Sequence, residues 1–173
     1  MLNFLIFRPF SRSLAIHSEC ITSRASQGPG GSVTGFTPFE PSLGGKWVSL
    51  LKEAEPIVEH IGLVYNPEPG NNSSAFRESI EKVANKVGIA SIETPSGDGS
   101  DIDHLIRSLK DKPNSGLIFL PDAITYFRRV QIAALVAQCE LPAIYPFRDF
   151  CAAGGRISYG VKIEKILVGC ILC

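Results

Sequence analysis

The chain has 173 residues, which is enough for one domain with a buried core. Its 17 basic and 17 acidic side chains give a formal net charge of zero, which argues against a nucleic-acid-binding protein because such proteins carry a basic surplus. Hydrophobic residues make up 45% of the chain, yet no apolar run reaches the roughly 18 residues needed to cross a bilayer, so we expect a globular fold.

The first 45 residues differ in composition from the rest. They are rich in serine and arginine, and glycine and proline cluster at 28–31 and again before residue 45. This composition predicts an irregular N-terminal segment over 1–45 and a folded domain over 46–173. The apolar start, Met1–Phe10, is not a recognisable signal peptide, because Arg8 follows the apolar residues instead of preceding them and Pro9 interrupts them.

From residue 46 onward, helical and strand patterns alternate. In chain order they predict a helix over Trp47–Val58, a strand over Ile61–Tyr65, a helix over Phe76–Val87, a strand over Ile89–Thr94, a helix around Ile102–Leu109, a strand over Gly116–Leu120, one long helix over Tyr126–Cys139, strands over Pro142–Tyr145 and Ile157–Tyr159, and a last helix over Ile163–Leu172. Ser100 with Asp103 resembles a capping box at the start of the third helix.

Short apolar strands that alternate with helices, without hairpin turns, predict a parallel sheet with helices on both faces. We therefore predict an α/β fold with a doubly wound five-stranded parallel sheet in the order 2-1-3-4-5. Ligands of such sheets bind beyond the carboxyl ends of the strands. The candidate site consequently lies in the loops 66–73, 121–125 and 145–149 and at the turn 159–160.

Polar side chains occupy the first two of these loops. Asn66, Asn72 and Ser73 lie before a helix, where they would bond a small polar ligand or would form an Asx turn and cap the helix. Asp122 and Thr125 follow the third strand. The Asp122 carboxylate would accept a hydrogen bond from a ligand amine or hydroxyl, or it would cap the next helix.

Aromatic and basic side chains follow the fourth strand. Tyr145 and Phe147 beside Arg148 suit a ligand with a flat apolar part and a negative end. The alternative is that Phe147 packs into the domain and that Arg148 pairs with Asp149 at the surface.

The sequence carries no strong catalytic, metal or cofactor motif. It contains no GxSxG elbow, no GxxxxGK[ST] loop and no dinucleotide fingerprint. Its five cysteines include one pair at i, i+3, Cys170 and Cys173 beside the chain end, with no second pair of ligands upstream. We therefore expect no catalytic residue, no metal ligand and no cofactor. One alternative stays open, in which Cys139 and Cys151 act as opposed acid–base thiols, as in some racemases.

Several motifs together resemble a known family. They are Gly30–Phe36, Gly45-Lys46-Trp47, Val64–Pro67, Gly116–Asp122, Leu141–Phe150 and Ile157–Gly160, in that order. This set is similar to bacterial ABC-transporter substrate-binding proteins with a type 1 periplasmic-binding fold, related to tryptophan-binding proteins. The resemblance extends over roughly residues 30–165.

The resemblance implies a non-catalytic protein in which two lobes close on a small solute and deliver it to a membrane permease with separate ATPase subunits. Residues 46–173 would be the C-terminal lobe, incomplete at its end, after a remnant of the first lobe. The positions that match ligand-facing loops are Asn66, Asn72, Ser73, Asp122, Thr125, Tyr145, Phe147 and Arg148, with Tyr159 as a weaker match. The family implies a periplasmic location, whereas a truncated product without a signal would stay in the cytoplasm.

Two other classes of protein share this architecture. One is a small α/β enzyme of racemase-like or flavodoxin-like form. The other is the ligand-sensing core of a transcription regulator, which would need an N-terminal helix-turn-helix that the glycines and prolines of residues 1–40 do not favour.

Overall fold

The computed structural model describes residues 4–6, 35–36, 40–68, 73–97, 99 and 101–160. The chain divides into two units, one of Met1–Glu40 with Lys162–Cys173 and one of Pro41–Val161. In the first unit, β1 (Phe4–Ile6) pairs antiparallel with β2 (Gly35–Phe36). The helix predicted over Ile163–Leu172 lies outside the described residues, as does Asn72.

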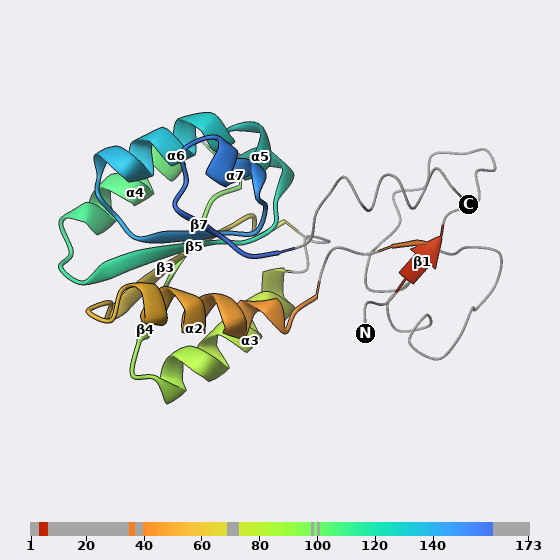
Figure 1. Ribbon diagram of the computed structural model, residues 1–173, viewed down its shortest axis with the longest axis horizontal. Helices are drawn as coiled ribbons and strands as arrows, with labels where there is room; N and C mark the ends of the chain where they lie inside the picture. Colours follow the sequence, from red (N-terminus) through yellow and green to blue (C-terminus); the bar gives the residue numbers. More distant parts are fainter. Residues whose placement is uncertain are drawn as a thin grey trace. The chain divides into compact units, whose positions relative to one another are not determined.

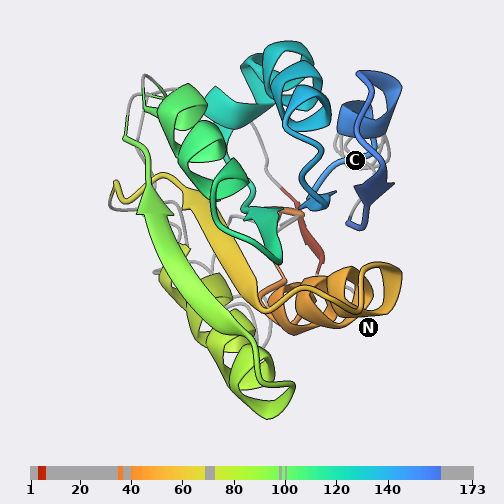
Figure 2. The ribbon, with the colours of Figure 1, turned by 90° about the vertical axis from the view of Figure 1, so that its left-hand side faces the viewer.

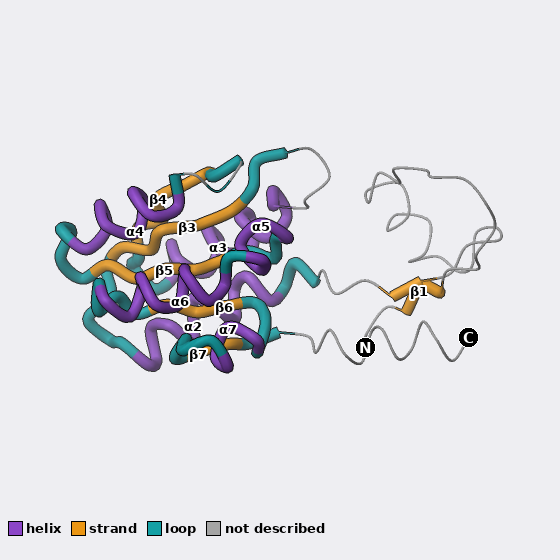
Figure 3. The backbone as a smooth tube through the Cα atoms, turned by 90° about the horizontal axis from the view of Figure 1, so that it is seen from above, coloured by secondary structure: helices purple, strands orange, loops and turns teal. Residues whose placement is uncertain are grey.

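The second unit is built around a five-stranded sheet (Figure 1). Its strands are β3 (His60–Tyr65), β4 (Ala90–Pro95), β5 (Ser115–Phe119), β6 (Ala143–Tyr145) and β7 (Ile157–Ser158). All neighbours are parallel, in the order β4-β3-β5-β6-β7, which Figure 3 shows from above. This confirms the predicted order 2-1-3-4-5 and the doubly wound α/β fold.

Helices cover both faces of the sheet, as Figures 1 and 2 show. One face is covered by α2 (Leu43–Ala54) and α3 (Ser73–Lys86). The other face is covered by α4 (Ile102–Lys110), α5 (Ala123–Phe127), α6 (Arg129–Gln138) and α7 (Asp149–Ala152). None of the helices in the described part of the chain has the length and apolar character needed to cross a membrane.

The two glycines at the start of α2 bring this helix close to α3. A Cβ on Gly44 would lie 2.8 Å from the carbonyl oxygen of Phe76, so only glycine fits there without a shift. The N–H of Gly45 donates to the Ser79 hydroxyl at 3.2 Å. One turn later, the Trp47 ring stacks on Phe76, and both rings are buried against the sheet.

The long helix predicted over Tyr126–Cys139 is wrong in one respect, because the segment forms two helices, α5 and α6, with a break at Arg128. The Arg128 guanidinium contacts the carbonyl oxygen of Gly99 and the carboxylate of Asp103, which anchors the break to the start of α4. At that start, the cap position is Asp101, which makes no side-chain cap bond, and Ser100 of the predicted capping box lies outside the described residues.

A hydrophobic core cluster lies between the sheet and the α4/α6 face. Its fully buried side chains include Val64, Ile102, Ile106, Leu117, Phe119, Ile132, Tyr145 and Phe150. The two outer strands differ in length, since β4 has six residues and β7 has two. This arrangement leaves the carboxyl ends of three buried strands at one edge of the unit, where the candidate loops begin.

Candidate functional site

The segments after β3, β5 and β6 lie at the same edge of the sheet. The parallel register pairs Val64 with Phe119 and Ile118 with Ile144, so these strands end together. Asn66 follows β3 directly, Asp122 comes three residues after β5, and Tyr145 is the last residue of β6. The structure therefore gathers the three predicted loops at one carboxyl edge.

Asn66 lies in a turn at the end of β3. It is half-buried, and its Oδ1 accepts a hydrogen bond from the N–H of Glu68 at 2.9 Å, as in an Asx turn. The preceding Tyr65 donates its hydroxyl to Glu93 at 3.2 Å, and the Arg77 guanidinium, which pairs with Glu93, lies 4.8 Å from the Tyr65 ring centroid. These contacts fix the strand end from which Asn66 projects.

Ser73 is half-buried at the first position of α3. Of the three residues predicted before this helix, the structure describes Asn66 and Ser73, and Asn72 lies outside the described residues. The ligand role of both residues stays a prediction.

Asp122 and Thr125 form the start of α5. One carboxylate oxygen of Asp122 accepts from the N–H of Ile124 at 3.1 Å, and the Thr125 hydroxyl donates to the Asp122 carbonyl oxygen at 3.1 Å. Asp122 is only 8% exposed, and this burial raises the pKa of its carboxyl, although hydrogen bonds from the Ile124 and Thr125 backbones act in the opposite direction. Asp122 thus caps α5, as in the alternative interpretation, and this role does not conflict with a ligand contact.

The raised pKa predicts a pH-dependent difference between the wild type and Asp122→Asn. As pH rises through the ordinary pKa range of Asp, the unfolded chain releases this proton before the folded protein does, which favours unfolding. We therefore expect the wild type to lose stability relative to Asp122→Asn as the pH rises from below to above the ordinary pKa of an Asp carboxyl. Urea unfolding at a series of pH values measures this difference. A difference that is constant with pH, or that changes in the other direction, would contradict the assignment.

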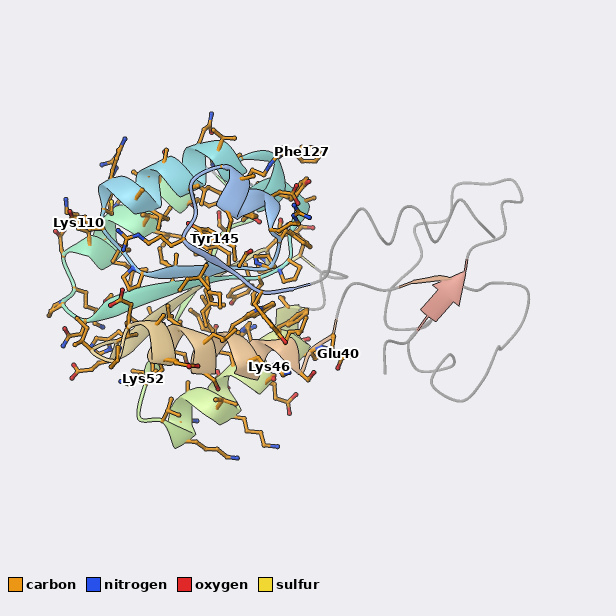
Figure 4. All side chains as sticks on the ribbon, in the orientation of Figure 1. Glu40, Lys46, Lys52, Lys110, Phe127 and Tyr145 are labelled. Carbon is orange, nitrogen blue, oxygen red and sulfur yellow. The ribbon has the colours of Figure 1, made fainter. Side chains whose placement is uncertain are left out.

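The Tyr145 side chain lies in the core, not at the surface of the edge (Figure 4). Its ring is 1% exposed and stacks on Phe119 and Phe150, with centroid distances of 5.0 and 4.6 Å. Among the described residues its hydroxyl has no hydrogen-bond partner, and burial, with a smaller contribution from Cys151, raises the pKa of this hydroxyl. In the described conformation Tyr145 therefore acts on the edge through its backbone, whose carbonyl oxygen accepts from the N–H of Tyr159 at 3.0 Å.

Phe147 and Arg148 lie beyond Tyr145. Phe147 is half-buried and packs edge-to-face against Tyr126, with centroids 5.5 Å apart, while Arg148 is exposed just before α7. Tyr159 is 37% exposed, and its hydroxyl lies 3.4 Å from the Lys46 Nζ. Of the aromatic and basic set predicted after β6, Phe147 and Arg148 are thus the side chains that reach the surface.

Two residues at this edge were not predicted from the sequence. Ser96 follows β4 and donates its N–H to the Tyr65 carbonyl oxygen at 2.8 Å. Its buried hydroxyl has no hydrogen-bond partner among the residues that the structure describes. Its position immediately after a strand was the available signal. Trp47 was predicted as an apolar helix residue and as part of the Gly45-Lys46-Trp47 motif, but not as a hydrogen-bond donor. Its indole N–H donates to the Tyr159 carbonyl oxygen.

A family model described as "ABC transporter substrate binding protein" matches residues 16–169, which is most of the chain. The chain belongs to this ABC transporter substrate binding protein family. The family is a binding class and not an enzyme class. A search of curated proteins finds no match.

Solved structures share the fold of this substrate-binding protein. An ABC domain from Streptococcus pneumoniae in complex with L-Trp has a TM-score of 0.67 at 22% identity, covering 83% of this chain and 48% of that one. A conserved domain protein from Vibrio cholerae has a TM-score of 0.63 at 21% identity, covering 80% and 44%. A periplasmic sugar binding protein from Legionella pneumophila has a TM-score of 0.55 at 14% identity, covering 77% and 53%. The chain therefore spans about half the length of these proteins.

The geometry does not favour the racemase-like alternative for this substrate-binding protein. Cys139 lines a groove at the amino ends of the strands, together with Ser115 and Pro142. Cys151 lies in α7, which follows the carboxyl end of β6. Cys151 does not line the groove that Cys139 lines, so the two thiols do not share it. Within the described ranges, no group of three or more His, Cys, Asp or Glu side chains is placed to hold a metal ion.

Proposed function

We propose that this chain is a solute-binding component of an ABC-type import system, and that its α/β unit supplies one wall of the ligand site. The observation that carries this proposal is the gathering of Asn66, Asp122 and the Phe147–Arg148 segment at one carboxyl edge. Ligands of doubly wound sheets bind at this edge. Membership of a substrate-binding family supports the same function.

The chemistry of the edge suits a small zwitterion with an apolar part. The Asp122 carboxylate would accept from a ligand ammonium group, and the Arg148 guanidinium would donate to a ligand carboxylate. Phe147 and Tyr126, which pack together, would contact an apolar or aromatic side chain. We therefore propose a small polar or aromatic solute of the amino-acid type, and the complex of a similar structure with L-Trp supports this choice.

The partners follow from the family. We propose that the protein delivers its solute to a membrane permease with separate ATPase subunits, in the periplasm, and that it catalyses no reaction. The similarity to a periplasmic sugar binding protein supports the location.

An NMR titration tests the proposed site. We expect L-tryptophan to shift the amide signals of residues 66–68, 122–125 and 147–149 and to leave residues 110–115, at the amino edge, unchanged. Binding by one wall should be weak, with a dissociation constant of about 1 mM or more, because a single lobe cannot exclude water from the ligand. Micromolar binding in a calorimetric titration would contradict the one-wall geometry.

Matched variants sharpen the titration. Asp122→Asn should weaken L-tryptophan binding further, whereas Asp111→Asn, an exposed acid just after α4 at the amino edge, should not. D-glucose serves as the comparison solute. If glucose shifts the same amides at lower concentration than L-tryptophan does, the proposed ligand class is wrong. If the shifts cluster at residues 110–115, the proposed site is wrong.

A further inference from the structure

Trp47 connects three elements of the α/β unit. It is the only tryptophan of the chain, and its side chain is 1% exposed. From α2, its indole Nε1–H donates to the Tyr159 carbonyl oxygen at 2.6 Å, beyond the end of β7. Its ring stacks on Phe76 in the first turns of α3, with centroids 5.3 Å apart and planes 19° apart. One buried side chain thus contacts both α3, the helix after β3, and the residue that follows β7.

The Tyr159-Gly160 turn, to which Trp47 is hydrogen-bonded, also packs against the segment after β6. The N–H of Tyr159 donates to the Tyr145 carbonyl oxygen at 3.0 Å. At Gly160, an added Cβ would overlap the Pro146 carbonyl oxygen and would lie 3.0 Å from its carbon, so the two backbones are in close contact. A displacement of the Tyr159-Gly160 turn therefore disturbs Pro146, which directly precedes Phe147 and Arg148.

The sheet alone gives this turn little support. β7 has two residues, and its register with β6 consists of the pairs Ile144–Ile157 and Tyr145–Ser158. A two-residue strand makes few ladder hydrogen bonds, so contacts from outside the sheet decide where the following turn lies. The buried indole N–H supplies such a contact, and a buried donor or acceptor without a partner is costly.

We propose that Trp47 is a positioning residue for the ligand site. Through Tyr159 and Gly160 it fixes the Pro146–Arg148 segment, and through Phe76 it fixes the first turn of α3, which begins at Ser73. The functional part of this inference rests on the proposed ligand site. Because Trp47 is buried, it acts through these segments and does not touch the ligand itself.

Hydrogen–deuterium exchange of the ligand-free chain tests the positioning role. Trp47→Phe keeps an aromatic ring against Phe76 but removes the N–H donor. We expect amide exchange in residues 145–150 and 157–160 to rise about tenfold or more, while exchange in β3 and β5 stays as in the wild type. The matched control is Leu51→Ala, which creates a cavity in the same helix without touching the turn, and which should raise exchange in the strands as well. Unchanged exchange at 145–150, or the same pattern in both variants, would overturn the proposal.

The wild type provides a second measurement that does not depend on the variant folding. Because the chain has one tryptophan, its indole N–H gives a single NMR signal, and we expect this proton to persist in D2O as long as the β3 and β5 amides do. Loss of the signal within the dead time of the experiment would overturn the proposal. Both measurements are made without ligand, so they decide the role of Trp47 even if L-tryptophan fails to bind and the proposed function is wrong.

Discussion

Replacing Tyr145 with Phe should stabilise the protein by about 1–3 kcal/mol, although the side chain is among the most deeply buried in the unit. The hydroxyl oxygen of Tyr145 is buried, and no group in the described part of the chain forms a hydrogen bond with it. Folding therefore removes its hydrogen bonds to water without replacing them. Phenylalanine keeps the stacking on Phe119 and Phe150 and removes the unsatisfied group.

The companion variant, Tyr145→Ala, should have the opposite effect. It removes a ring from the centre of a three-ring stack and leaves a cavity, which should cost about 3–5 kcal/mol. Urea unfolding of the two variants and the wild type under identical conditions measures both changes. If Tyr145→Phe destabilises the protein, the hydroxyl has a partner in solution, and the account of an unsatisfied group is wrong.

Replacing Gly160 with Ala should destabilise the protein by about 1–3 kcal/mol, which is the usual range for overpacking. The new methyl group would overlap the carbonyl oxygen of Pro146, and this neighbour is backbone, so no change of rotamer can relieve the overlap. The turn must then move away from Pro146, at the expense of the hydrogen bond from Tyr159 to Tyr145.

The matched control is Gly97→Ala, because a Cβ on Gly97 would meet no atom of the described surroundings within 4 Å and the residue does not have a positive φ. We expect this control to change the free energy of unfolding by less than about 0.5 kcal/mol. Thermal or urea unfolding of both variants makes the comparison. Equal stabilities for Gly160→Ala and Gly97→Ala would show that the turn can separate from Pro146 without cost.

The strands and their order could be predicted because both depend on local patterns. Short apolar runs such as Gly116–Leu120 identify buried parallel strands, and the alternation with helices leaves few topologies. The break at Arg128 could not be predicted in this way. The side chain that anchors it contacts Gly99 and Asp103, which are 29 and 25 residues away in the sequence. Periodicity within one segment contains no information on such a contact.

The same distinction applies to the candidate site. The sequence predicts which loops meet at the carboxyl edge, because parallel strands place their ends together, and it predicts Asp122 as a helix cap. It does not predict the direction of the Tyr145 side chain. That direction depends on Phe119 and Phe150, which come from β5 and α7. The ligand contacts of Asp122, Phe147 and Arg148 stay predictions until the titration is made.

The unequal lengths of the outer strands have a consequence for solubility. A long strand at the margin of a sheet offers unpaired backbone groups to other molecules and so promotes aggregation. β7 has two residues and so exposes few unpaired backbone groups, whereas β4 has six residues. Within β4, the charged pair of Glu93 with Arg77 and the terminal Pro95 are the features that natural sheets use as gatekeepers. We therefore expect the cluster around Glu93 to oppose self-association of the folded protein as well as to fix the end of β3.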